Sequence, residues 1–316
     1  MIAAIRRGCL RAFVFSSLAF ACLGAAAYQG PPPDPDAVDM QNLNFDSLAI
    51  LTGGGGHSIL FSTESGVVVV VDAKRPTVGP RLVEAVKAWT DDRPVAAVIN
   101  THAHVDHTGG NAAFAAPVDI IAHENTRANV ARMGGVRAPT KTFKDKLSLS
   151  YGKDRVELYY FGAGHTDGDT VVVLPVQRLA YLGDLFPGKT VPVIDAGNGG
   201  SALAFPQTLA KALSEITGVT RVIPSHATPP EGRRLHSQGR GWMSWAELQE
   251  YAAFVRDFVA AATDARRAGK TVDEGVAAVK SALADSYPGY DMDGTKATVQ
   301  AVYQELQQQD GRTNPR

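Results

Sequence analysis

Cysteine is nearly absent from this sequence of 316 residues, which contains only Cys9 and Cys22. Both lie within the first 27 residues, so removal of that segment would leave a chain without a thiol. Disulfide bonds, thiolate metal ligands and a cysteine nucleophile are then excluded from the mature chain. Histidine and aspartate are left to carry metal and acid–base chemistry.

A hydrophobic run long enough to span a bilayer is also lacking. The apolar stretch 12–23 is too short, but it follows Arg6, Arg7 and Arg11 and precedes three alanines at 25–27. This pattern is typical of an export signal with a small-residue cleavage site. We therefore expect residues 1–27 to be a signal peptide and the protein to be periplasmic or secreted, with no membrane span in its mature form. The alternative is a lipoprotein modified at Cys22.

An excess of basic residues is missing as well. The chain has 31 Lys and Arg against 32 Asp and Glu, and three of the arginines lie in residues 1–27. Without them the balance is 28 (31 minus 3) against 32, a net charge of −4. Such a surface gives no electrostatic footprint for nucleic acid. We expect a small-molecule substrate instead.

The rest of the chain divides by composition. Residues 28–44, with prolines at 31–33 and 35, are expected to form an extended linker. Residues 45–235 alternate strand-like and helix-like patterns, and residues 236–316 carry helical patterns alone. We expect one α/β domain followed by a helical C-terminal extension, which packs against the domain or contributes to a homodimer.

Local signals define several elements. Apolar runs at 59–61 and 67–71 predict a hairpin. Pro80 and Pro206 each predict the start of a helix, and Gly218 is expected to end the second. In the extension, Ser244 with Glu247 and Thr271 with Glu274 match the capping box that begins a helix. Further elements are expected as a strand over 95–99, a helix over 124–133, strands around 156, 171 and 179, and a third apolar helix face over 299–306.

The most informative motif covers residues 102–107, with the sequence HAHVDH, directly after the strand-like run 95–99. Imidazole and carboxylate are ligands that suit zinc, iron or manganese. Alternate spacing lets His102 and His104 point to one side, while Asp106 and His107 face a neighbouring point. Because one tetrahedral or five-coordinate ion cannot use all four side chains without strain, the motif predicts two metal ions.

Other histidines and aspartates follow strand-like runs in the same way. His165 and Asp169 follow the run 156–161, Asp184 follows 179–182, and His226 follows 220–223. Each run therefore places a His or Asp at a strand terminus, where the missing metal ligands are expected.

Taken together, these motifs resemble the metallo-β-lactamase fold superfamily of metallohydrolases. The matching segments are HxHxDH at 102–107, GHTxGD at 164–169, GD at 183–184 and PSH at 224–226, within residues 45–230. The resemblance implies a four-layer αββα metallo-β-lactamase sandwich. It also implies that the first metal is bound by His102, His104 and His165, the second by Asp106, His107 and His226, and that Asp184 bridges the two.

Two divalent ions, expected to be Zn²⁺ with iron or manganese as alternatives, can lower the pKa of a water held between them to about 7. We therefore expect an exported dinuclear-metal hydrolase that uses a metal-bridging hydroxide to cleave an ester, thioester, lactone or amide. Asp106 and Asp184 are the candidates for catalytic proton transfer. The ligand set is similar to glyoxalase II-like and lactonase-like members, since true β-lactamases usually lack the bridging aspartate. A β-lactamase, an iron-dependent redox enzyme of the same fold and a non-catalytic metal-binding protein remain as alternatives.

Several residues have weaker signals. Asp72 ends the run 67–71, and by the resemblance it supports the metal ligands from outside the set. His57, His123 and His236 are interpreted as structural, and the glycines at 53–56 as a flexible turn or strand edge, because no phosphate-loop lysine follows them.

The loop 186–201 follows Asp184 and is rich in glycine and proline, so we expect it to select the substrate. Lys189 in that loop is either a solvated lysine or a contact for a substrate carboxylate. Trp242 and Trp245 are candidates for a wall of the active-site mouth.

Overall fold

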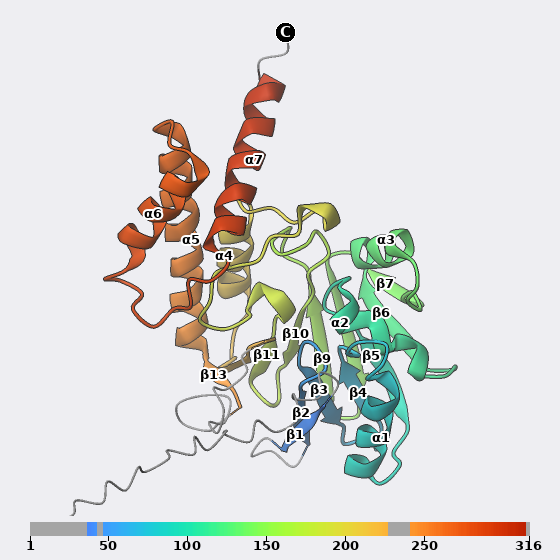
Figure 1. Cartoon of the computed structure of the whole chain (residues 1–316). Helices are drawn as coiled ribbons and strands as arrows, with labels where there is room; N and C mark the ends of the chain where they lie inside the picture. The colour runs from blue at the N-terminus through green and yellow to red at the C-terminus, as the bar shows by residue number, and fades with distance from the viewer. Residues whose placement is uncertain (1–36, 43–46, 227–240, 314–316) are drawn as a thin grey trace, which may run out of the picture. The chain divides into compact units, whose positions relative to one another are not determined.

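The computed structural model describes residues 37–42, 47–226 and 241–313. The expected signal peptide, most of the expected linker and His236 lie outside these ranges. The described residues belong to one compact unit, in which two β-sheets carry helices on their outer faces (Figure 1). No helix among the described residues combines the length and the apolar character needed to cross a bilayer.

The first sheet has its strands in chain order, antiparallel from β1 to β4 and parallel from β4 to β7. The β3–β4 hairpin is the one predicted from the two apolar runs. β1 lies inside the stretch that was expected to be a linker. The strands are β1 (Asp39–Asn42), β2 (Leu48–Thr52), β3 (Ser58–Ser62), β4 (Val68–Val71), β5 (Val95–Ile99), β6 (Asp119–His123) and β7 (Lys141–Phe143).

The second sheet has the order β13-β12-β11-β10-β9-β8, and only β11 and β12 pair in parallel. Sequence patterns did not indicate β8, whose inward residues alternate with exposed ones but are only partly buried. The strands are β8 (Lys146–Tyr151), β9 (Asp154–Tyr159), β10 (Val171–Leu174), β11 (Leu179–Tyr181), β12 (Arg221–Ile223) and β13 (Met243–Ser244).

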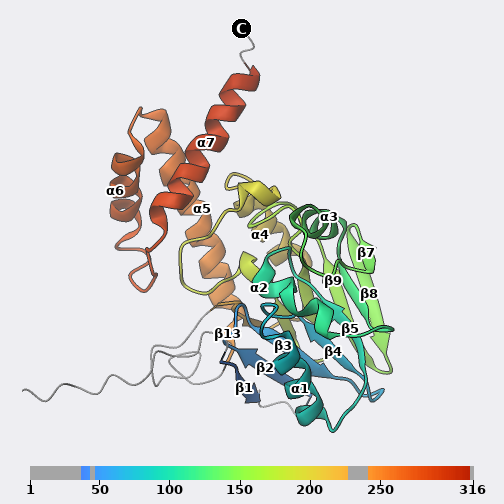
Figure 2. The same ribbon diagram turned by 45° about the vertical axis from the view of Figure 1, so that its right-hand side comes forward.

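Alternation along the strands builds three apolar layers. Val68 and Val70 of β4 pack with Leu82 of α1 (Gly79–Thr90) on the outer face of the first sheet. Val69 and Val71 face the second sheet, where Val172 of β10 lies in the same cluster. On the far side of the second sheet, residues of β10 pack with α4 (Phe205–Glu215) and α5 (Trp245–Arg267). The predicted αββα sandwich is therefore confirmed, and Figure 2 shows the helices on either side of the sheets.

Two predicted helix boundaries can be compared directly. α3 (Glu124–Met133) has the expected limits and ends at Gly134. The predicted end of α4 at Gly218 is wrong, because the helix stops at Glu215. Ile216 already has an extended backbone, with ψ 117°, and buries its side chain in the core. The helix therefore ends before the glycine, because the Ile216 side chain is buried from an extended backbone.

The C-terminal extension begins with α5 and continues with α6 (Val272–Leu283) and α7 (Thr295–Thr313). Both predicted capping boxes are present, at Ser244 and Thr271. Buried residues of all three helices, among them Val255, Val279 and Val302, join the cluster that covers the second sheet. The extension therefore packs against the sandwich.

Candidate metal centre

The predicted ligands lie where strands end at one edge of the sandwich. His102 and His104 occupy the loop after β5, and Asp106 and His107 begin α2 (Val105–Thr108). His165 lies in the loop between β9 and β10. The other two ligands follow strands of the second sheet, with Asp184 in a short 3-10 helix, η2 (Gly183–Leu185), after β11 and His226 after β12.

The structure brings these side chains together in two groups, each with ligand atoms within 4.8 Å of one another. The groups match the division that the resemblance implied, with Asp184 counted in the first. The first group is His102, His104, His165 and Asp184, and the second is Asp106, His107 and His226.

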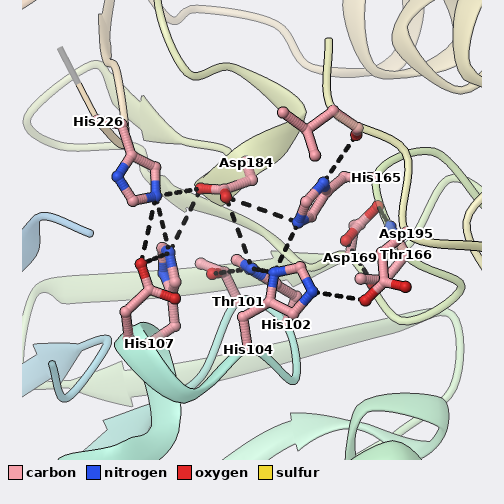
Figure 3. A network of polar contacts seen from close by, with 12 residues as sticks. Thr101, His102, His104, His107, His165, Thr166, Asp169, Asp184, Asp195 and His226 are labelled. Atoms are coloured by element: carbon pink, nitrogen blue, oxygen red, sulfur yellow. Dashed lines mark hydrogen bonds and ion pairs between the residues drawn. The ribbon is translucent and has the colours of Figure 1, made fainter. Parts of the chain in front are cut away.

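Asp184 lies between the groups and directs one oxygen to each (Figure 3). Its Oδ2 is 3.8 Å from His102 Nε2 and 3.5 Å from His165 Nε2. Its Oδ1 is 3.3 Å from His107 Nε2 and 3.2 Å from His226 Nε2. This is the placement that a carboxylate bridging two cations requires.

Hydrogen bonds on the outer side fix the orientation of three imidazoles. His107 Nδ1 donates to Asp72 Oδ2 at 2.7 Å, and His104 Nε2 donates to Asp195 Oδ2 at 2.6 Å. His165 Nδ1 donates to the carbonyl of Val193 at 2.8 Å. Because each acceptor is a carboxylate or carbonyl oxygen, these nitrogens carry the ring protons. The opposite nitrogens then present lone pairs to the interior of the site.

Thr101 extends the same arrangement to His102. The Thr101 hydroxyl donates to Asp72 Oδ2 at 2.8 Å and lies 3.1 Å from His102 Nδ1. A hydroxyl that donates to Asp72 is left to accept from His102 Nδ1–H. The backbone N–H of Thr101 donates to Asp72 Oδ1 at 2.8 Å. Asp72, which is completely buried, thus orients His107 directly and His102 through Thr101. The predicted supporting role of Asp72 is confirmed.

The donor set fits divalent cations. His104 Nδ1 lies 3.1 Å from His102 Nε2 and 3.0 Å from His165 Nε2. Lone pairs that face one another at this distance repel unless a cation lies between them. Among the described residues, no hydrogen-bond donor reaches the buried Asp184 Oδ1. A carboxylate oxygen in this setting is satisfied by a metal ion.

Burial and neighbouring charges set the protonation states. Burial alone would raise the pKa of Asp184, but the imidazoles of His107 and His102 hold that pKa well below its usual range. Burial holds the pKa of His102 well below its usual value, and His107 lowers it further. Burial would lower the pKa of His107, but the carboxylates of Asp72 and Asp184 hold that pKa well above its usual value. Because metal ions bind the neutral imidazole, an ion at His107 Nε2 would displace the proton on that atom.

A family model described as the metallo-beta-lactamase superfamily matches residues 51–226, more than half of the chain. The chain belongs to the metallo-beta-lactamase superfamily. A solved structure of a metallo-beta-lactamase from Pontibacter korlensis superposes with a TM-score of 0.58 at 21% identity, covering 70% of this chain and 99% of that one. At that identity the likeness shows the shared fold alone.

Curated relatives carry different names. The 2,4-dinitroanisole O-demethylase subunit alpha of Nocardioides sp. (strain JS1661) is 32% identical over 149 residues, 46% of this chain and 45% of that protein. A metallo-beta-lactamase type 2 of Bacillus sp. (strain 170) is 28% identical, over 57% of this chain and 70% of that protein. The hydroxyacylglutathione hydrolase of Polaromonas sp. (strain JS666 / ATCC BAA-500) is 33% identical, over 45% and 50%. The chain thus spans about half the length of the first and third relatives.

Lactamase and hydroxyacylglutathione hydrolase are both names of hydrolases. The donor set of this superfamily member is that of a metal-dependent hydrolase.

A cavity of about 480 Å³ opens over the metal centre. Its floor includes His104, Asp106, His165, Asp184 and His226, and its walls come from the loop 187–194 and from residues 293–298. The loop after Asp184 therefore lines the cavity, as the sequence indicated. The first turn of α7 lines it too, so the C-terminal extension contributes to the site as well as to packing.

Other predicted residues lie outside this cavity lining. Lys189 pairs with Glu250 at 3.3 Å instead of facing the metals. The expectation that Trp242 and Trp245 wall the mouth is wrong: Trp242 packs against the cluster between the sheets, and Trp245 against the one that covers the second sheet. Apolar contact with the core holds both rings there.

The remaining candidates have structural contacts. His123 donates from Nε2 to the carbonyl of Lys144 at 2.8 Å and stacks on Tyr160, as expected of a structural histidine. Asp169 is buried and accepts hydrogen bonds from the Thr166 hydroxyl at 2.5 Å and the Thr166 N–H at 2.8 Å. Burial raises the pKa of Asp169 to about 8. These contacts hold the loop that carries His165.

Asp195 is a residue beside the ligand groups that sequence reasoning missed. It lies in the glycine-rich loop after Asp184, far along the chain from His104, and it also accepts from Asn198 Nδ2 at 2.6 Å. No periodicity or motif marks it, because its role depends on how the loop folds back over His104.

Proposed function

We propose that this protein is an exported, dinuclear metal-dependent hydrolase that cleaves an ester, thioester, lactone or amide bond in a small, uncharged substrate. The observation that carries the proposal is the position of Asp184, with one oxygen toward each ligand group. The pattern of residues 1–27 supports export to the periplasm or outside the cell.

The two groups of ligand side chains indicate which residues would hold each metal ion. His102, His104 and His165 would hold one ion, Asp106, His107 and His226 the other, and Asp184 both; Zn²⁺ suits these imidazole and carboxylate ligands. When bound, two such ions supply an activated water and polarise the scissile carbonyl.

Asp106 is the better placed of the two carboxylates to move a proton to the leaving group. Both side chains line the cavity, but that of Asp106 is 22% exposed, whereas that of Asp184 is 14% exposed and has both oxygens directed at ligand nitrogens. A carboxylate open to the substrate can exchange protons without leaving the ligand set.

The cavity walls support a compact apolar group next to the scissile bond. Aliphatic side chains of Val191, Val193, Ile194 and Ala297 line it, and its volume of about 480 Å³ suits a small molecule. Outside the metal donors, Asp293 is the one charged residue among the described residues of the lining. A neutral substrate avoids repulsion by that carboxylate.

The wall from α7 is fixed in place by hydrogen bonds. The Thr298 hydroxyl donates to the carbonyl of Pro192 at 2.7 Å, and the N–H of Val191 donates to the carbonyl of Asp291 at 3.1 Å. These bonds join the loop after Asp184 to the extension and hold the two walls of the cavity together.

The proposal is tested by a substrate panel of neutral esters, thioesters, lactones, β-lactams and phosphodiesters on zinc-, manganese- and iron-loaded protein. We expect hydrolysis of the neutral carbonyl substrates, lost on chelation and restored by metal. We expect little β-lactam turnover. Absence of carbonyl hydrolysis in every metal form would overturn the proposal. Oxygen consumption by the iron form alone would favour a redox enzyme.

Ala297→Phe should narrow the cavity without touching a metal donor. Because the ring would take up part of the cavity that Val191 and Ile194 also line, we expect kcat/KM for a hexanoyl ester to fall about tenfold or more, and that for an acetyl ester to change less. Gln300→Phe, on an exposed position of the same helix outside the cavity lining, is the matched control. Equal losses for both esters would contradict the placement of the acyl group against α7.

A further inference from the structure

The glycine run 53–56 packs directly against two ligands of the second group. A Cβ on Gly55 would lie 2.7 Å from Asp106 Cβ, and a Cβ on Gly56 would overlap the ring of His107. Gly55 also has a φ of +117°, which side chains rarely adopt. The run lies in the turn between β2 and β3, at the end of a strand, as predicted. Close backbone approach, and not flexibility, is what requires glycine there. The loop forms a wall behind Asp106 and His107.

The next residue, His57, holds the chain segment that carries the third ligand. Its N–H donates to the carbonyl of Ser225 at 2.8 Å, and its Nδ1 donates to the carbonyl of Pro224 at 2.7 Å. Burial lowers the pKa of His57 to about 3, so the ring is neutral. Pro224 and Ser225 immediately precede His226. The loop 53–57 therefore contacts Asp106 and His107 directly and the backbone that carries His226.

Lys74 closes this loop. Its side chain is completely buried, and its Nζ donates to the carbonyls of Leu51 and Gly56, each at 2.6 Å. Leu51 precedes the glycine run and Gly56 is its last residue, so one ammonium group holds the two ends of the run together. Burial lowers the pKa of Lys74 to about 7, while Asp72 and Asp106 raise it. A buried amine is costly unless it is bonded in this way.

The two residues before Lys74 also contact the second group. Asp72 accepts from the His107 ring, and the N–H of Ala73 donates to the carbonyl of His107 at 2.7 Å. Asp72 and Lys74 both have left-handed backbones, with φ of 62° and 67°. Non-glycine residues hold this conformation only where the surroundings enforce it, often at functional sites. The segment 72–74 therefore supports His107 in three ways. Asp72 binds the ring of His107, Ala73 binds its backbone, and Lys74 binds the loop behind it.

We propose that Lys74 is a positioning residue for the second metal ion. Its hydrogen bonds hold the loop 53–57 in place, and this loop positions Asp106, His107 and His226. Two imidazoles of the first group, His104 and His165, are held by other contacts, through Asp195 and Val193. Loss of the Lys74 hydrogen bonds therefore weakens binding of the second ion selectively. The inference rests on the two-ion centre of the proposed function, and it is independent of the substrate.

Lys74→Met tests this proposal, because methionine keeps an unbranched side chain and removes the donors. Metal content by mass spectrometry and calorimetric titration with Zn²⁺ should show one ion bound as in the unmodified protein and the second weakened about 10- to 100-fold. Asp195→Asn is the mirror-image control and should weaken the first ion instead.

Gly56→Ala provides the second variant and keeps Lys74 in place. The added methyl group displaces the His107 ring, so the same selective loss of the second ion is expected. If circular dichroism shows that Lys74→Met does not fold, the metal binding of Gly56→Ala tests the proposal instead. Two ions bound with unchanged affinity, or parallel weakening of both, would overturn the proposal. A single ion in the unmodified protein would instead refute the two-ion centre.

Discussion

Asp184→Asn is expected to lower kcat/KM for a neutral ester on the order of a thousandfold. The substitution removes the negative charge between the two ligand groups and turns an amide N–H₂ toward one of them. In the structure, Asp184 Oδ1 lies 3.3 Å from His107 Nε2 and Oδ2 lies 3.5 Å from His165 Nε2. An amide cannot bridge two cations on both atoms, so we expect weaker binding of at least one ion.

The measurement is steady-state kinetics together with metal content of the same preparation. Asp293→Asn is the control, because Asp293 lines the same cavity and belongs to neither ligand group. Its kcat/KM for a neutral ester should stay within about threefold of the unmodified value. An Asp184→Asn protein that retained two ions and most of its activity would refute the bridging role.

Asp72→Asn is expected to weaken metal binding about 10- to 100-fold, most strongly at the second group. Asp72 Oδ2 accepts from both His107 Nδ1 and the Thr101 hydroxyl. An amide nitrogen in that place donates, and it would meet the proton on His107 Nδ1. The ring then favours the tautomer with its proton on Nε2, the atom that faces the metal.

Zinc titration of Asp72→Asn, with thermal unfolding in parallel, checks this expectation. The matched control is Asp154→Asn, another buried carboxylate, which accepts from the N–H of Glu64 at 2.7 Å and from Gln177 Nε2 at 3.2 Å. It lines a different pocket from the metal site. We expect that control to change stability without changing zinc affinity. Equal zinc affinity for Asp72→Asn and the unmodified chain would contradict the proposed orientation of His107.

The ligands were predictable because each follows an apolar strand and therefore lies at a sheet edge. The spacing within the segment from His102 to His107 also predicts that its first two ligands and its last two lie in different groups, as the structure has them. The fold followed from the order of these motifs through the family resemblance, since alternating strands and helices alone allow other α/β folds.

What surrounds the ligands was less predictable, for physical reasons. A lysine is rarely buried, so sequence gives no reason to place Lys74 beneath the glycine loop. Asp195 reaches His104 only because a loop without periodicity folds over it. The turn at the glycine run was predicted, but the reason for its glycines was not. Chain flexibility and close approach favour the same residue, and only the neighbouring Asp106 and His107 distinguish them.

The C-terminal extension shows a similar limit. Its helices were recognisable from their capping boxes and apolar faces, which predict packing. The contribution of Ala297 and Thr298 to the cavity depends on the tie between Thr298 and Pro192, which no sequence pattern encodes. The substrate-facing surface is therefore shared between the sandwich and the extension.

Stepwise addition of Zn²⁺ to metal-free protein, with ester hydrolysis followed at each step, tests the two-ion hydrolase most directly. Both ligand groups are complete in the structure, so we predict that activity rises until about two zinc ions are bound per chain and then stays constant. Full activity in the metal-free protein, or a maximum at one ion that a second does not change, would contradict the account.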